Sequence, residues 1–255
     1  YYAVTVGDVR LVVLFATNIW RVPSLNANAR GRYRERDEDL TEPERWGYGQ
    51  HIFEAIAPGS EQYNWLQAEL ASPDFTQAKY KLVMFHHPPH SLGDNIVPAY
   101  TDPIQFIDYF PDGTIKAVRY EYPQGDDYLV RDVLPLLEAA GTHLVLYGHS
   151  HLWNRFTSAT GTHYLETSNV GNTYGAFWGE TRRPIPIGYQ ETYAPTGDPN
   201  GLEPVMPAIA ANPSAPLANG ASDNPNPFVD EAGNLQPFLA SNKITAFSIL
   251  DTGTG

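Results

Sequence analysis

The sequence predicts an α/β fold in which β-strands deliver histidines to one edge of a sheet. Two apolar runs, 82–85 and 144–147, are typical of buried parallel strands, and each stops at a cluster of imidazoles. The two clusters hold five of the eight histidines: His86, His87, His90, His149 and His151. Because α/β folds place their chemistry at the carboxyl edge of the sheet, we expect a site there.

The first half of the chain alternates strand, helix and strand. Residues 9–16 are apolar and predict a buried strand. Ser60 is a suitable N-cap for a helix that ends near Ala71, and Glu61 then lies where the helix dipole favours a carboxylate. The next predicted strand is 80–86.

The second half continues the alternation. Residues 128–140 predict a helix with one apolar face, in which Pro135 fits if the regular helix begins just before it. Strands follow at 142–147 and 162–167, and 243–250 predicts a closing strand. We therefore expect an αββα sandwich, with mixed sheets flanked by helices.

Length and composition predict one domain over residues 1–255. A chain that is 42% hydrophobic can bury one core, and 18% charged residues are too few for a disordered polymer. The segment 91–126, rich in Asp, Pro and Tyr, and the segment 178–240, poor in periodicity, are expected to be long loop insertions. The first would overhang the histidine edge, either as a specificity lid or as decoration.

Charge and cysteine content exclude several classes of function. A net charge of −13 disfavours a nucleic-acid surface, because such binding depends on Lys and Arg. A site for an anionic substrate in so acidic a protein would need metal cations to make it locally positive. The chain has no cysteine, which excludes disulfides and thiolate ligands, and it has no apolar run long enough to span a membrane.

The clustered histidines predict a metal site. A lone histidine beside a strand usually has a structural role. Here two clusters of histidines follow two strands in the same layout, which favours metal binding over a structural role. Neutral imidazole is a common ligand of borderline transition metals. We expect the two clusters to bind metal together, with Gly148 permitting the turn that lets His149 and His151 reach neighbouring metal positions.

Several motifs resemble one family. Residues 86–91 resemble the His-x-Pro element, and 148–155 the Gly-His-x-His element, of calcineurin-like metallophosphoesterases. Within that superfamily, residues 1–14, 60–66 and 161–164 resemble the purple acid phosphatase branch. These stretches keep the family's order over most of residues 1–175.

The resemblance implies a two-metal site that hydrolyses phosphate monoesters or diesters with a metal-activated hydroxide. His86 and His149 would bind one metal and His151 the other, the metals being Fe, Zn or Mn. His87 satisfies the same spacing and is the alternative to His86. His90, where relatives often have tyrosine, would contact the phosphate or the leaving group, unless it is a solvent-facing loop residue. His87 and His90 are thus the candidate catalytic residues.

The chain also departs from the family, because the carboxylate-bearing elements that precede these motifs are absent. We expect it to be the carboxyl-terminal part of a catalytic domain, inactive alone, with the missing amino-terminal fragment as a possible partner. Two hypotheses stay open: a metallophosphoesterase, or a non-catalytic relative with a structural or binding role outside the cell. The resemblance favours an extracellular or periplasmic location.

Overall fold

The computed structural model describes about half of the chain. The described residues are 1–16, 42, 54–93, 101, 104–121, 123–167, 198, 200–206, 232, 234–240, 250 and 252. The predicted closing strand 243–250 lies outside them except for Leu250, as does most of the predicted insertion 178–240.

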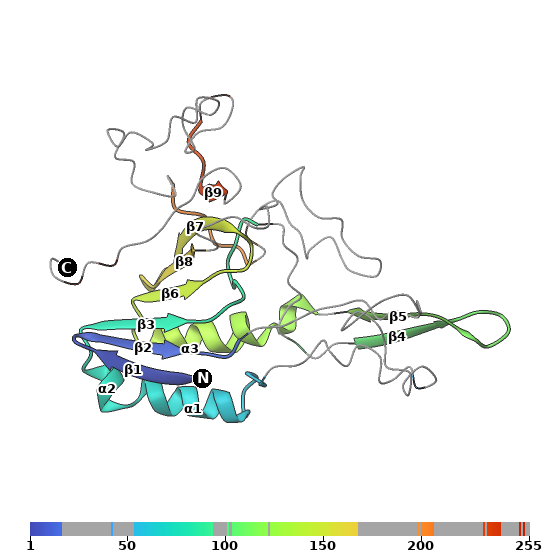
Figure 1. Ribbon diagram of the computed structural model, residues 1–255, viewed down its shortest axis with the longest axis horizontal. Helices are drawn as coiled ribbons and strands as arrows, with labels where there is room; N and C mark the ends of the chain where they lie inside the picture. The colour runs from blue at the N-terminus through green and yellow to red at the C-terminus, as the bar shows by residue number, and fades with distance from the viewer. Residues whose placement is uncertain are drawn as a thin grey trace.

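A seven-stranded mixed sheet organises these residues, in the order β1-β2-β3-β6-β8-β7-β9 (Figure 1). Strands β2, β3, β6 and β8 are parallel, whereas β1, β7 and β9 pair antiparallel to their neighbours. The strands are β1 (Tyr2–Val6), β2 (Val9–Val13), β3 (Tyr80–Met84), β6 (Leu144–Tyr147), β7 (Leu152–Thr157), β8 (His163–Thr167) and β9 (Phe238–Ala240). The predicted α/β class with a mixed sheet is confirmed.

The crossover from β2 to β3 contains two capped helices, α1 (Glu61–Leu70) and α2 (Pro73–Thr76). Ser60 is the N-cap predicted for α1, and its hydroxyl accepts a hydrogen bond from the backbone N–H of Tyr63 at 3.2 Å. Ser72 caps α2 in the same way. These caps satisfy N–H groups that a helix start leaves unpaired, so both helices begin where the sequence dictates.

The crossover from β3 to β6 ends in a helix whose first turn is irregular. Residues Leu129–Val133 form a π-helical turn, and the α-helix α3 (Leu134–Ala139) follows. Pro135 lies in the first turn of α3, where its missing N–H is not needed. The regular helix thus begins just before the proline, as predicted.

The helices pack on one face of the sheet, where they form the main core with alternate strand residues. Val83 and Phe85 from the β3 segment, and Val145 and Tyr147 from β6, belong to this core and point the same way. A part-buried ion pair ties β2 to α1, because Arg10 donates to both carboxylate oxygens of Glu69 at 2.7 and 2.8 Å. This ion pair fixes the helix layer to the sheet at β2.

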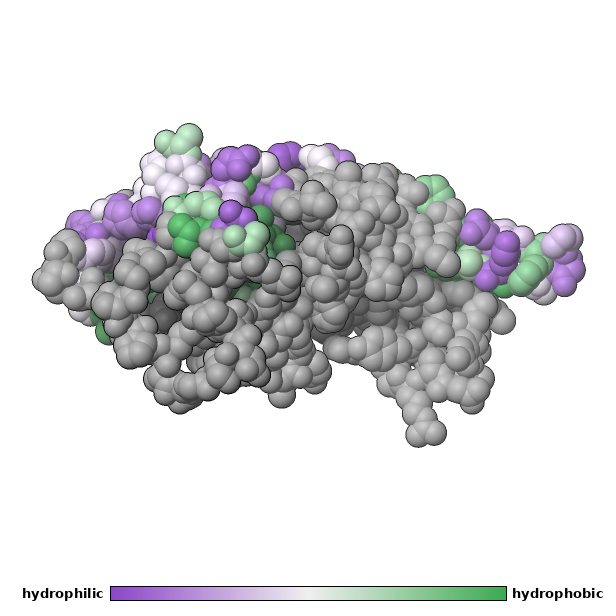
Figure 2. Space-filling model, turned by 90° about the horizontal axis from the view of Figure 1, so that it is seen from above, coloured by the Kyte–Doolittle hydropathy of each residue, from purple (hydrophilic) through white to green (hydrophobic). Residues whose placement is uncertain are grey.

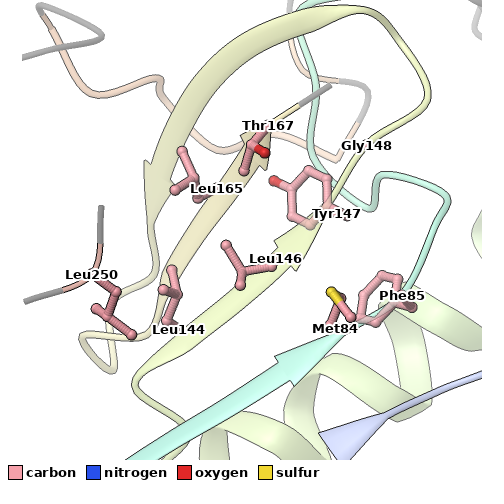
Figure 3. Close-up of a pocket in the computed structure, with 9 residues that line it drawn as sticks. All are labelled: Met84, Phe85, Leu144, Leu146, Tyr147, Gly148, Leu165, Thr167 and Leu250. Atoms are coloured by element: carbon pink, nitrogen blue, oxygen red, sulfur yellow. The ribbon is translucent and has the colours of Figure 1, made fainter. Parts of the chain in front are cut away.

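The opposite face of the sheet carries an apolar hollow of about 440 Å³ (Figure 3). Met84, Leu144, Leu146, Leu165, Thr167 and Leu250 line it on this face, and Phe85, Tyr147 and Gly148, at the carboxyl ends of the β3 and β6 segments, border it. Both faces of the central strands are therefore apolar, as expected for parallel strands in the interior of an α/β domain.

The region 91–126 contains a hairpin that the sequence analysis treated as loop. Strands β4 (Ile104–Tyr109) and β5 (Ile115–Glu121) form a separate antiparallel sheet that extends away from the seven-stranded sheet (Figure 1). Seen from above, hydrophobic and hydrophilic residues alternate along this arm (Figure 2).

No helix among the described residues has the length and hydrophobicity needed to cross a membrane.

Candidate metal centre

The two histidine clusters lie side by side because their strands are neighbours. β3 and β6 pair in parallel, so their carboxyl ends reach the same edge of the sheet. The pairing continues past both strands: the N–H of Phe85 donates to the carbonyl of Leu146 at 3.1 Å, and the N–H of Gly148 donates to the carbonyl of His86 at 3.0 Å. This extended ladder sets the register of the two clusters.

Three imidazoles converge at this edge. One ring nitrogen from each of His86, His87 and His149 lies within 4.8 Å of the others. The Nδ1 atom of His149 lies 3.2 Å from the Nε2 atom of His86. A zinc ion with bonds of about 2.0 Å holds two tetrahedral nitrogen ligands about 3.3 Å apart. The spacing of this pair therefore fits two ligands of one ion.

The electrostatics of the cluster favour neutral rings. Burial lowers the pKa of His87 well below the ordinary value of 6.5, and the neighbouring His149 and His86 lower it further. His86 is more exposed, yet partial desolvation lowers its pKa, and His151 adds to the effect. Because metals bind the unprotonated nitrogen, these shifts keep the lone pairs available at neutral pH.

The loop that carries the second cluster is strained. His149 has φ of 87° and His151 has φ of 64°, a left-handed conformation that side chains other than glycine rarely adopt. The left-handed residues of this loop are the two histidines and not Gly148, which is absent from the described glycines with positive φ. The two histidines take the turn themselves, and such strain is typical of functional loops.

His151 does not join the three-histidine group. It lies near enough to His86 to lower the pKa of that residue electrostatically. The structure thus brings together His86 and His149, which the sequence analysis assigned to one metal, and adds His87, the alternative to His86. The assignment of His151 to a second metal stays a prediction.

His90 is buried rather than solvent-facing. Its side chain is 6% exposed, and its ring lies 4.8 Å from that of Tyr164 and 5.7 Å from that of Phe156. Its Nδ1 atom lies 2.8 Å from a carboxylate oxygen of Asp198, which is itself 1% exposed at the side chain. The alternative of a solvent-facing loop histidine is therefore wrong, and contact with phosphate stays a prediction.

Asp198 and Glu166 were missed by sequence reasoning. Asp198 accepts hydrogen bonds from the backbone N–H groups of Ser91 and Leu202 as well as facing His90, and nothing in its Pro- and Gly-rich surroundings marks it. Glu166 lies under the histidine loops and is fully buried. The sequence does carry a sign of Glu166, because an acidic residue on the inward side of a strand is unusual.

The described residues supply an imidazole set for a borderline metal such as zinc or iron. No Asp or Glu joins the three-histidine group among the residues that the structure describes. Three neutral nitrogen ligands fit Zn²⁺ or Fe²⁺, and open positions would remain for further ligands. Any bridging carboxylate has to come from outside this group.

No protein-family model matches this chain, and no curated protein matches it. Among solved structures it is similar to purple acid phosphatase PPD1 isolated from yellow lupin (Lupinus luteus) seeds, with a TM-score of 0.33, 15% identity, and coverage of 73% of this chain and 25% of that one. It is also similar to GAP50, the anchor in the inner membrane complex of Plasmodium, with a TM-score of 0.32, 13% identity, and coverage of 71% and 39%. The chain thus spans well under half of either protein, and neither likeness carries information on activity.

Proposed function

We propose that this chain supplies the imidazole side of the metal centre of a metal-dependent phosphoesterase. The observation that carries the proposal is the 3.2 Å approach of His86 and His149 across two separate clusters. Those clusters are also the elements whose sequences resemble the His-x-Pro and Gly-His-x-His motifs of metallophosphoesterases. Geometry and motif point to the same residues.

The chemistry follows from the needs of a phosphate ester. His86, His149 and His151 would hold the metal ions, which when bound supply charge neutralisation and a hydroxide for attack on phosphorus. His87 is buried and neutral in this arrangement, so it can serve as a further ligand or accept a proton. His90, held by Asp198, fixes the first loop beneath the site.

One observation favours a second candidate, a non-catalytic protein that uses the same fold for structure or binding. The described residues bring only imidazoles to the centre, whereas a two-metal hydrolase needs bridging carboxylates. Such a protein would bind metal through His86 and His149 without turning over a phosphate ester.

The test is hydrolysis of p-nitrophenyl phosphate by the full-length protein that contains this chain. We expect the activity to vanish with a strong chelator and to return with Zn²⁺, Mn²⁺ or Fe²⁺. His149→Ala should lower the rate by several orders of magnitude, because the loss of a ligand disturbs both the metal and its hydroxide.

His163→Ala is the matched control. His163 is exposed at the start of β8, at the opposite end of the sheet, where its Nδ1 atom lies 3.2 Å from the hydroxyl of Thr157. This substitution should change the rate less than about threefold. Metal binding without any hydrolysis would establish the non-catalytic candidate, and the absence of metal binding would remove both.

A further inference from the structure

A buried carboxylate lies directly beneath the candidate metal centre. Glu166 is on β8, opposite Asn154 of β7, and its side chain points to the same face of the sheet as the helices. It is 0% exposed. A buried carboxylate is costly unless hydrogen bonds compensate it, so its partners identify what the residue does.

The partners of Glu166 come from both histidine loops. Its Oε2 atom accepts from the hydroxyl of Ser91 at 2.7 Å and from the amide of Asn154 at 2.8 Å. Its Oε1 atom accepts from the backbone N–H of Ser150 at 2.9 Å. Ser91 follows the first histidine cluster, and Ser150 lies between His149 and His151. One carboxylate therefore bonds both loops.

The two loops also touch one another at this point. The hydroxyls of Ser91 and Ser150 lie 3.1 Å apart. The first loop also bonds β7, because the N–H of Leu92 donates to the side-chain oxygen of Asn154 at 3.4 Å. All of these groups except the Leu92 backbone belong to buried side chains. The result is a small polar network inside an otherwise apolar layer, centred on Glu166.

The bond to Ser150 acts on the strained part of the second loop. Ser150 is flanked by His149 at φ of 87° and His151 at φ of 64°. A backbone in this conformation persists only when its surroundings constrain it strongly. The hydrogen bond from the Ser150 N–H to the buried Glu166 side chain is such a constraint, because a buried N–H that loses its partner cannot replace it with water.

We infer that Glu166 is a positioning residue that latches the two histidine loops together and thereby holds His86 and His149 at ligand spacing. This inference rests on the proposed metal centre. Glu166 is not part of the three-histidine group, and it acts through its bonds to Ser91 and Ser150.

The test measures binding of Co²⁺ alone to the full-length protein, by affinity and by the visible absorption of the bound ion. Glu166→Gln keeps the shape of the side chain. An amide N–H₂ in place of Oε2 would face the N–H₂ of Asn154, so two donors would meet and the hydrogen bond between the two side chains would be lost. We expect at least a tenfold loss of Co²⁺ affinity and a changed absorption band, because the ligand geometry relaxes.

Glu138→Gln is the matched control. Glu138 on α3 accepts from the hydroxyls of Tyr164 at 2.6 Å and Thr160 at 3.0 Å, and neither partner belongs to the two histidine clusters. Its substitution should lower the melting temperature and leave the Co²⁺ affinity and spectrum unchanged. The pair of variants separates positioning from general stability.

The outcomes distinguish the latch from the site. If Glu166→Gln binds Co²⁺ with unchanged affinity and an unchanged spectrum, the latch is overturned and the metal centre stands. If the unmodified protein binds no Co²⁺, both the metal centre and the latch are overturned. If Glu166→Gln does not fold, Ser91→Ala replaces it, since it removes the bonds of the Ser91 hydroxyl to Glu166 and to Ser150 and leaves the bond from the Ser150 N–H to Glu166. A severalfold loss of affinity in Ser91→Ala supports the latch, and unchanged affinity overturns it.

Discussion

The Nδ1 atom of His149 lies 3.2 Å from the Nε2 atom of His86, although 63 residues separate them in the chain. The approach follows from the parallel pairing of β3 and β6, which continues through the bond from the N–H of Gly148 to the carbonyl of His86. The relation between the two rings is thus a property of backbone register. It is sensitive to anything that moves one loop against the other.

The substitution Gly93→Ala tests this sensitivity. A Cβ atom at Gly93 would overlap the Cβ and Oγ atoms of Ser150. Both belong to buried surroundings, so the loop that carries His149 has to shift. We expect a loss of about 1–3 kcal/mol in the free energy of unfolding and a Co²⁺ affinity lowered about tenfold.

Denaturant titration and Co²⁺ binding measure the two effects. Gly125→Ala is the control, since a Cβ atom there meets nothing within 4 Å. It should cost under about 0.5 kcal/mol and leave Co²⁺ binding unchanged. Equal behaviour of the two alanine variants would show that the loops tolerate displacement.

The substitution Asp198→Asn tests the support of the first loop. Asp198 faces the Nδ1 atom of His90 at 2.8 Å, and it accepts from the N–H groups of Ser91 at 3.2 Å and Leu202 at 2.9 Å. An amide cannot accept at both oxygen positions, so one buried donor loses its partner. We expect a loss of about 1–3 kcal/mol in the free energy of unfolding.

Hydrogen exchange at the amides of Ser91 and Leu202 should accelerate in Asp198→Asn, which localises the effect. Asp112→Asn is the control: Asp112 is exposed in the turn between β4 and β5, and one of its oxygens accepts from Thr114. It should cost under about 0.5 kcal/mol. Unchanged exchange at Ser91 would contradict the support assigned to Asp198.

The pH dependence of stability reports on His87. Burial lowers its pKa well below 6.5, so in mild acid the unfolded chain binds a proton that the folded protein does not. The free energy of unfolding therefore does not depend on His87 above about pH 6.5. Below that pH it falls, until the lowered pKa of His87 is reached, by at most about 1.4 kcal/mol per pH unit.

Comparison of wild type with His87→Gln isolates this effect in metal-free protein. The free energy of unfolding, measured in urea from pH 7.5 to pH 5, should fall more steeply with acidification in the wild type. Groups that do not interact with His87 contribute equally to both proteins and cancel in the difference, so the comparison reports on His87 together with its coupling to His86 and His149. Parallel curves would mean that His87 takes up its proton as readily in the folded state.

Local features of the chain were predictable from sequence because local physics decides them. The strand ends before His86 and His149, the cap at Ser60 and the start of the helix at Pro135 each depend on a few neighbouring residues. The hairpin β4–β5 was also within reach, since alternating strands flank an Asp-Gly turn at Asp112.

β7 was missed for a different reason. Residues 152–157 are half polar, and Asn154 on the inward side breaks the apolar pattern of a strand. Its burial makes sense only once Glu166 is opposite it in the sheet. The pairing of two polar residues inside a core is a tertiary fact.

The sequence by itself determined the α/β class, the main elements and the two histidine clusters, because periodicity, capping and strand ends are read within short windows. Only the tertiary structure decided that His87 joins His86 and His149, that His90 is buried against Asp198, and that Glu166 bonds both loops. Those relations join residues distant in the chain through strand order and register. No local pattern encodes which side chains meet when parallel strands are brought together.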